Sequence, residues 1–226
     1  MNKRKITEYF DPLVKKVKNE VISELQWRHI KRDNLDLSFT TIFDKPQCRN
    51  ILADLENELE YLTGDLAKVK VFGKIYPIPR KQAAYGELGV KYKYSGTTIS
   101  AKLWTPTLQY LVDRVHQITG HKYNFALVNR YKDGADKMGF HKDDEKELCK
   151  STPIASLTFG AERDFVFQHQ DKKSCGISDE KMILTDGLLL LMNEPTNTYW
   201  YHGIPIRKAC KDLRINITFR KIVNQG

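Results

Sequence analysis

His141 and Asp143 lie two residues apart, a spacing that can bring an imidazole and a carboxylate to one point. In an extended segment alternate residues project to the same side, so both side chains would converge. Such pairs often arise by chance, and a distant second histidine is needed to complete a metal site. His202 follows a β-prone run of aromatic residues and is the candidate. Two histidines and one carboxylate are the ligand set of non-haem Fe(II) oxygenases, so the sequence predicts an iron centre of these three residues.

A predicted strand near the C-terminus has one apolar and one polar face. Its apolar positions, which we assign to the core, are Leu213, Ile215, Ile217 and Phe219. Its polar positions, which can all face one cavity, are Arg214, Asn216, Thr218 and Arg220. A buried arginine is costly unless it meets an anion. A dicarboxylate co-substrate would supply that anion, with a geometry that suits a guanidinium.

These motifs resemble the AlkB family of Fe(II)/2-oxoglutarate dioxygenases, and its homologue-2 group most closely, over residues 27–223. The resemblance rests on His141-x-Asp143, His202 and Arg214-x-Asn216-x-Thr218-Phe219-Arg220. It implies an enzyme that repairs duplex DNA by oxidising N-alkyl groups on flipped bases such as 1-methyladenine and 3-methylcytosine. Fe(II) would be the cofactor and 2-oxoglutarate and O2 the co-substrates. Formaldehyde, succinate and CO2 would be released.

The resemblance also implies roles for residues outside the metal site. Those expected to bind 2-oxoglutarate are Asn129, Tyr131, Arg214, Asn216, Thr218 and Arg220. Arg214 would pair with the distal carboxylate, and Arg220 would orient Asp143 or the co-substrate. The residues expected to bind the flipped base are Tyr92, Tyr94, Ser95, His141, Asp144 and Glu145. Tyr94 would stack on the base opposite His141, at a position where the family relative has Phe.

A basic segment at residues 68–74 is predicted to form a hairpin, with Phe72 next to Gly73 at the turn. Phe72 is either a packed hairpin residue or a wedge that fills the gap left by an extracted base. The resemblance favours the wedge, because the family has an apolar finger that matches Val71 and Phe72. The residues expected to contact DNA are Val71, Phe72, Gly73, Lys74, Arg80 and Gln82.

The bulk composition fits a nucleic-acid partner without requiring one. Lys and Arg number 37 against 28 Asp and Glu, a net charge of +9, which favours a polyanion but is also common in merely soluble proteins. No Cys-x-x-Cys pair predicts a zinc site, and without a signal peptide we expect reduced thiols at Cys48, Cys149, Cys175 and Cys210. The longest apolar run, residues 188–192, is too short to span a membrane. We expect a nuclear monomer.

Residues 1–26 are expected to form a basic N-terminal tail. Ile6, Tyr9 and Phe10 resemble a sliding-clamp-binding peptide, although Lys3 stands where such peptides have Gln. The alternatives are a disordered or short helical tail, or a basic cluster for nuclear import or DNA contact. Residues 13–25 have helical spacing of apolar side chains.

Residues 27–226 are predicted to form the dioxygenase domain. Helices are expected from Asp44 to about residue 62, before Gly64, and over residues 104–118, before Gly120. Strands are expected at residues 37–43, 123–131, 154–159, 163–168, 182–184, 188–192, 198–202 and 213–222. This pattern predicts an α+β, mainly β fold, a double-stranded β-helix or jelly roll with flanking helices. Residues 27–120 would form helices and a nucleotide-recognition lid, and residues 121–226 the jelly-roll core.

Two rival functions and several bland interpretations stay open from the sequence. The chain could be an Fe(II)/2-oxoglutarate enzyme that acts on RNA, single-stranded DNA or protein, or a non-catalytic nucleic-acid-binding module. The remaining histidines lack a paired carboxylate and are expected to be ordinary surface or hydrogen-bonded residues: His29, His116, His121 and His169. Residues 171–173 form a polar loop that could touch phosphate, but solvated surface is favoured.

Overall fold

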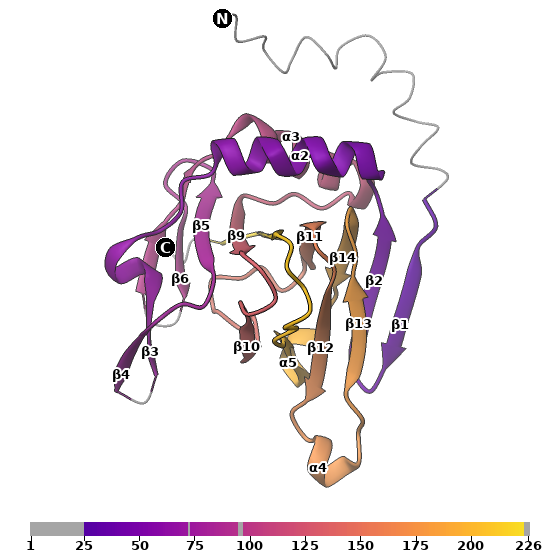
Figure 1. The fold of residues 1–226 in the computed structure, drawn as a ribbon. Helices are drawn as coiled ribbons and strands as arrows, with labels where there is room; N and C mark the ends of the chain where they lie inside the picture. The colour runs from indigo at the N-terminus through magenta and orange to yellow at the C-terminus, as the bar shows by residue number, and fades with distance from the viewer. Residues whose placement is uncertain (1–24, 72, 95–96, 224–226) are drawn as a thin grey trace, which may run out of the picture.

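The computed structural model describes residues 25–71, 73–94 and 97–223 (Figure 1). The helix predicted over residues 13–25 lies almost entirely outside this part. The predicted clamp-binding residues Ile6, Tyr9 and Phe10 lie outside it too, as do Phe72 and Ser95.

A large sheet forms one wall of the fold. It contains eight strands, and its neighbours are antiparallel except for the parallel pair at one end. Their order is β1 (Arg28–Arg32), β2 (Leu35–Thr41), β14 (Leu188–Met192), β11 (Ile154–Gly160), β16 (Arg214–Arg220), β9 (Phe125–Tyr131), β5 (Lys81–Gly86) and β8 (Lys102–Leu103). Because β1, β2, β5 and β8 precede residue 120, the sheet draws on both halves of the predicted domain.

A smaller sheet faces the large one. Its four strands are β10 (Met138–His141), β15 (Trp200–Ile204), β12 (Arg163–His169) and β13 (Glu180–Leu184), in that order. Apolar side chains of both sheets meet in one cluster, including Leu188 and Leu190 of the large sheet and Phe165 and Trp200 of the small one. Two facing sheets around a common interior make the predicted jelly roll.

Two helices cover the outer face of the large sheet (Figure 1). α2 (Lys45–Glu58) begins at Asp44, whose side chain forms a capping box with Gln47, and α3 (Pro106–Thr119) is capped by Thr105 and ends at Gly120 with φ +73°. The apolar face of β16 shares one core cluster with both helices, so its other face is turned toward the small sheet. Figure 1 shows α4 (Lys172–Cys175) at the far end, beyond β12 and β13.

Two hairpins flank the sheets on the side of β5 (Figure 1). β3 (Lys68–Val71) pairs with β4 (Lys74–Pro77), as predicted, and Gly73 has φ +81° at their turn. β6 (Lys91–Tyr94) pairs with β7 (Thr97–Ser100). The second hairpin packs on β9 through Tyr92 and Ile99. Its use as a nucleotide-recognition lid stays a prediction.

Two element predictions needed correction. α2 ends at Glu58 and not near residue 62, because Leu59 is extended and Leu62 donates its backbone N–H to Gln82 of β5. The strand predicted over residues 198–202 begins as a short helix, α5 (Thr196–Tyr199), and β15 starts at Trp200. The sequence analysis also missed β1, and a short 3₁₀ helix at Gly64–Ala67.

Candidate metal centre and co-substrate pocket

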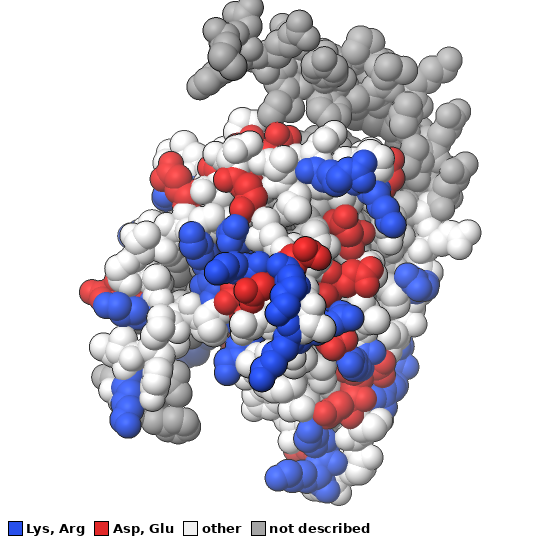
Figure 2. All heavy atoms as spheres, in the orientation of Figure 1, with Lys and Arg blue, Asp and Glu red and all other residues white. Residues whose placement is uncertain are grey.

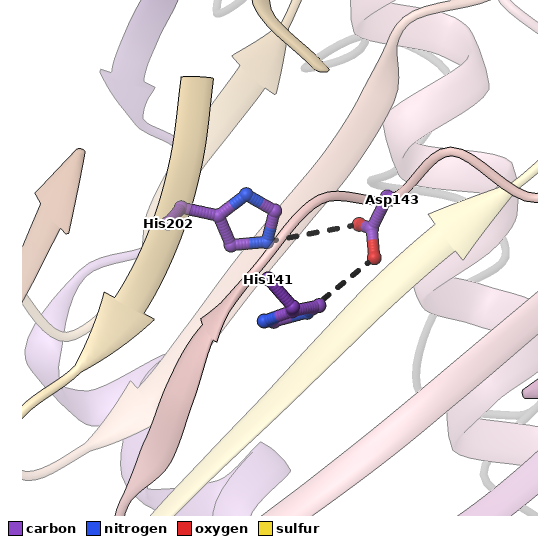
Figure 3. A group of neighbouring side chains, drawn as sticks. All are labelled: His141, Asp143 and His202. Atoms are coloured by element: carbon purple, nitrogen blue, oxygen red, sulfur yellow. Dashed lines mark ion pairs between the residues drawn. The ribbon is translucent and has the colours of Figure 1, made fainter. Parts of the chain in front are cut away.

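His141, Asp143 and His202 converge in the interior between the two sheets (Figure 3). Their ligand atoms all lie within 4.8 Å of one another. Nε2 of His141 is 3.6 Å from Oδ1 of Asp143, and Nε2 of His202 is 3.9 Å from Oδ2. These separations are too long for hydrogen bonds, and they leave a shared point that each group faces. Among the described residues, this is the group of histidine, cysteine and acidic side chains arranged to hold a metal.

The small sheet sets the positions of the two histidines. His141 ends β10 and lies directly across from His202 of β15, with a register shift in β10 before it. Asp143 follows in the loop beyond β10. The two side chains converge as predicted, although only His141 belongs to a strand. Nδ1 of His141 donates to the Gly139 carbonyl at 3.0 Å, which leaves Nε2 free to bind a metal.

Lys142, between the two ligands, ties their loop to the start of β15. Its ammonium donates to the Thr198 carbonyl and to the Gln170 amide at 2.7 Å, and lies 4.9 Å from the ring centre of Tyr201. The loop is thereby anchored between its two ligand residues.

Arg220 is the electrostatic partner of Asp143. Both are buried, and Nη2 of Arg220 donates to Oδ2 of Asp143 at 2.9 Å. Burial alone would raise the pKa of Asp143, but Arg220 and the neighbouring histidines more than offset it, so the pKa lies well below its ordinary value. Asp143 is therefore a carboxylate in the folded protein, the form that binds metal.

The two histidines differ in their protonation. Burial and the charge of His141 lower the pKa of His202 to about 3, so its ring is neutral near pH 7. Burial also disfavours the charged form of His141, but Asp143 outweighs it and raises the pKa of His141 above its ordinary value. Protons therefore compete with a metal mainly at His141.

The polar face of β16 continues from the metal centre into a hollow between the two sheets. Asn216 and Thr218 of β16, Asn129 and Tyr131 of β9, and the three metal-centre residues contribute to its lining. Oδ1 of Asn129 accepts hydrogen bonds from Arg80 Nε at 2.6 Å and from Gln82 Nε2 at 3.0 Å. Asn216 is fixed by Ser156, Thr158 and Thr218 on the neighbouring strands or its own.

Arg214 lies next to this hollow and is fully buried. It donates to Asn216 Oδ1 and, at 3.1 Å, to Thr158 Oγ1, and its guanidinium lies 5.0 Å from the ring centre of Tyr131. Burial lowers its pKa to about 10, so it stays charged near pH 7. Its Nε and Nη1 have no hydrogen-bond partner within the described residues, so two donors remain for an anion.

The residues fit both an iron ion and a dicarboxylate. Two imidazoles that can be neutral and one ionised carboxylate are the ligand set typical of non-haem Fe(II). Oδ1 of Asp143 is also a buried acceptor without a hydrogen-bond partner in the described structure. The unmatched donors of Arg214 fit a carboxylate of 2-oxoglutarate. Bound Fe(II), with 2-oxoglutarate and O2, would supply the oxidation chemistry.

Residues predicted to bind the base are only partly brought together. Tyr92 is fully buried and donates to Glu145 Oε1 at 2.6 Å, and Arg220 lies 5.3 Å from the centre of its ring. Burial and then Asp143 raise the pKa of Glu145. Asp144 is exposed, and the side chain of Tyr94 lies outside the described structure. In this structure Tyr92 of β6 is thus linked to Asp143 through Arg220, which contacts both.

Residues predicted to contact DNA also divide into two sets. Gly73 and Lys74 are exposed on the β3–β4 hairpin, and the side chain of Val71 lies outside the described structure. Gln82 is buried and, with the half-buried Arg80, holds Asn129 at the pocket. Their predicted contacts with DNA stay predictions, and their visible contacts are with a predicted co-substrate residue.

Sequence reasoning missed Arg163. It is buried at the start of β12 and donates to the carbonyls of Asp133, Asp136 and Pro205, which lie in two loops beside the site. The sequence signal for it was an arginine at a position of the strand where alternation places side chains in the interior.

The other predictions have mixed outcomes. All four cysteines are free, and Lys172 of the polar loop pairs with Asp179 on the surface. The remaining histidines lie outside the metal group, and His169 stacks on Tyr199.

Comparison with known proteins agrees with this geometry. Residues 39–220 match the 2OG-Fe(II) oxygenase superfamily. The human DNA oxidative demethylase ALKBH2 is 50% identical over 201 residues, 87% of this chain and 77% of that protein. The rat alpha-ketoglutarate-dependent dioxygenase alkB homolog 3 is 37% identical over 153 residues, 65% of this chain and 51% of that protein.

The jelly roll also has a solved counterpart. The structure of OsALKBH1 superimposes with a TM-score of 0.57 at 14% identity, covering 86% of this chain and all of that one, which shows the fold. The metal triad is formed, a polar strand lies behind it, and half of the 201 aligned residues are shared with the human demethylase. The chain therefore belongs to the AlkB family of Fe(II)/2-oxoglutarate dioxygenases.

Proposed function

We propose that this protein is a DNA repair oxidative demethylase that removes N-alkyl groups from bases in duplex DNA. The observation that carries the proposal is a complete iron triad in a chain half identical to mammalian DNA oxidative demethylases ALKBH2, at 50% for human and 49% for mouse and cow. The proposed lesions are 1-methyladenine and 3-methylcytosine. Both lesions disrupt base pairing, so extracting them costs less than extracting a normal base.

Each side chain of the pocket has a proposed task. Arg214 binds the distal carboxylate of 2-oxoglutarate, assisted by Asn129, Tyr131 and Thr218, and Arg220 holds Asp143 ionised and oriented. The oxidised N-methyl carbon becomes a hemiaminal, which releases formaldehyde and the restored base. Support comes from the unmatched donors of Arg214 and from the Arg220 contact at 2.9 Å.

The flipped base would enter beside His141. Tyr94 would stack on it, with Ser95, Asp144 and Glu145 nearby, and Tyr92 would hold Glu145 through its hydroxyl. The Val71–Phe72 finger would fill the gap in the duplex, and Gly73, Lys74, Arg80 and Gln82 would lie near the DNA. The β3–β4 hairpin projects from the body beside a hollowed notch, a shape that suits this role (Figure 2).

The charge of the molecule suits a DNA partner. The net charge is +9, and Figure 2 shows Lys and Arg gathered at the centre of one face, between the projecting hairpin and the small sheet. A nuclear location follows from this substrate. Within the described residues, no helix is long and apolar enough to cross a membrane.

The N-terminal tail is proposed to bind the DNA sliding clamp through Ile6, Tyr9 and Phe10, which lie outside the described structure. Titrating a peptide of residues 3–10 against the clamp, beside a Tyr9→Ala, Phe10→Ala peptide, tests this. Equal weak binding by both peptides would leave only a charged tail. The enzyme itself is proposed to act as a monomer.

Mass spectrometry of a methylated duplex tests the main proposal. The oligonucleotide is incubated with protein, Fe(II) and 2-oxoglutarate, and loss of 14 mass units per methyl group is expected, with succinate formed in equal amount. The same strand without its complement, and the same sequence in RNA, serve as comparison substrates. Conversion of RNA alone would overturn the DNA assignment, and no succinate at all would favour a non-catalytic module.

A further inference from the structure

The interior of the jelly roll carries an excess of positive charge. Among the described residues, the buried charged side chains are one carboxylate, Asp143, and three guanidiniums, Arg163, Arg214 and Arg220. Of the three arginines, only Arg220 contacts this carboxylate. A buried charge without a counter-charge is costly, so Arg163 and Arg214 call for an explanation.

Arg163 is held by backbone carbonyls. Nη1 donates to Asp133 O at 3.1 Å, and Nη2 donates to Asp136 O at 2.8 Å and to Pro205 O at 2.7 Å. The first two carbonyls lie in the loop that joins β9 to β10, and the third lies in the loop that joins β15 to β16. One side chain therefore fixes both loops that connect the strands of the metal and co-substrate residues.

Those loops are also joined by backbone hydrogen bonds at Gly134. Its N–H donates to Cys210 O, and its carbonyl accepts from Arg207 N, both at 2.9 Å. A Cβ at position 134 would lie 1.8 Å from Arg207 O. The two loops thus have a second connection that does not involve the charge of Arg163.

The two unpaired guanidiniums meet at one aromatic ring. Arg163 lies 5.8 Å and Arg214 5.0 Å from the ring centre of Tyr131. Burial, and in smaller part the charge of Arg163, lower the pKa of Arg214. The fold therefore keeps two like charges close enough to repel each other, next to a residue that lines the co-substrate pocket.

We propose that Arg163 is a positioning residue for 2-oxoglutarate: it fixes Tyr131 and the two loops, and its charge adds to that of Arg214 in drawing the distal carboxylate. A dianionic co-substrate supplies the negative charge that neither guanidinium otherwise meets. The inference rests on the use of 2-oxoglutarate proposed above, and not on which nucleic acid is the substrate.

A purely structural role makes a different prediction. If Arg163 only holds loops, its loss should weaken every ligand of the pocket alike. If its charge acts on the distal carboxylate, its loss should weaken 2-oxoglutarate more than a 2-oxo acid that lacks this carboxylate. The ratio of the two affinities separates the roles.

The test is calorimetric titration of the Mn(II)-loaded full chain, without O2, with 2-oxoglutarate and with 2-oxobutanoate. Arg163→Met should weaken 2-oxoglutarate binding by about tenfold or more, as loss of a nearby, partly screened charge implies. It should change 2-oxobutanoate binding by about twofold at most. Arg163→Lys keeps the charge without the three-carbonyl fork, and should recover most of the 2-oxoglutarate affinity.

Gly134→Ala is the matched control, because it displaces the same loops without removing charge. It should weaken both 2-oxo acids by the same factor. Equal losses for both acids in Arg163→Lys and in Arg163→Met, or unchanged 2-oxoglutarate affinity in folded Arg163→Met, would overturn the proposal. If the wild-type chain bound Mn(II) but not 2-oxoglutarate, the co-substrate assignment itself would fail.

Discussion

Asp143 serves the metal and Arg220 at once, so two substitutions should have separable effects. Asp143→Asn keeps the size and an oxygen for Arg220 but loses the charge, and we expect it to abolish Mn(II) binding and turnover. Both substitutions leave Arg220 buried without a counter-charge, but Asp143→Ala also removes the oxygen that accepts its hydrogen bond, and should destabilise the metal-free protein by about 3–5 kcal/mol, more than Asp143→Asn. Metal titration and urea denaturation measure the two effects. Turnover by Asp143→Asn at saturating iron would remove Asp143 from the triad.

His141 should set the acid limit of metal binding. Its pKa is raised in the metal-free protein, chiefly because Asp143 outweighs burial, whereas burial lowers that of His202 to about 3. Between about pH 5 and 8 only His141 therefore releases a proton when metal binds. Mn(II) affinity should fall as the pH drops through the pKa of His141, by about tenfold per pH unit. A slope of two protons in this range would contradict the assignment.

At the scale of elements, the polar face of β16 was predictable because a strand has a period of two. Ile215, Ile217 and Phe219 face the helices, and the polar residues between them face the interior. The metal triad was predicted from the same period of two with a distant histidine added, although of His141 and Asp143 only His141 lies in a strand. These features depend on neighbours in sequence, which a single chain displays directly.

The features that sequence reasoning missed depend on distant backbone. Arg163 is fixed by carbonyls 30, 27 and 42 residues away, and the periodicity of a sequence does not predict partners at such separations. Gln82 lies on β5, which pairs with β9, and its side chain donates a hydrogen bond to Asn129 of that strand. Tyr92 is buried because its hairpin folds back on β9. Long-range packing decides all three.

The turn between β1 and β2 was also missed, although its sequence carries a signal. Asp33 and Asn34 have φ +47° and +63°, the left-handed pair of a two-residue hairpin turn. Asn34→Ala should lower the free energy of unfolding by about 1 kcal/mol, because a Cβ without a local hydrogen-bonding group disfavours this region. Asn34→Gly, the matched control, should be near neutral in thermal unfolding. Equal stability of both variants would argue against a strained turn.

Phe72 lies in the sequence between β3 and β4, outside the described residues, and its proposed role predicts a substrate-dependent loss. Phe72→Ala should slow repair of a methylated duplex by about ten- to a hundredfold, since stacking contributes on the order of 1–3 kcal/mol per base. Repair of the same strand without its complement should hold nearly constant, because no gap needs filling. Rates on both substrates measure this. A proportional loss on both would make Phe72 a packing residue.

At the scale of the whole molecule, positive charge occurs in two separate places. Most of the net charge of +9 lies outside the core and suits a polyanion, whereas the buried excess of Arg163, Arg214 and Arg220 over Asp143 sits between the sheets. Salt screens exposed charges much more than buried ones. The two places should therefore answer to different ligands, DNA outside and a small dianion inside. Only the inner ligand should couple strongly to the stability of the jelly roll.

Metal and co-substrate should consequently stabilise the fold in a fixed order. A ligand at a hundred times its dissociation constant stabilises the native state by about 2.7 kcal/mol, which is about 5–10 °C in a domain of this size. Mn(II) should raise the melting temperature alone. 2-Oxoglutarate should add a comparable rise only after Mn(II), because we propose that it binds the metal as well as Arg214. Melting curves of the metal-free, metal-loaded and doubly loaded chain measure both increments.

Two variants assign the increments to residues. Arg214→Met should keep the Mn(II) increment and lose most of the 2-oxoglutarate increment, because it removes the two unmatched donors without touching the metal ligands. Asp143→Asn should lose both, since the co-substrate then has no metal to chelate. Arg130→Met is a useful comparison, because Arg130 lies on the neighbouring strand and pairs with Glu56, away from the pocket. It should lower the starting melting temperature and keep both increments. A full 2-oxoglutarate increment in Arg214→Met would show that another group binds the distal carboxylate.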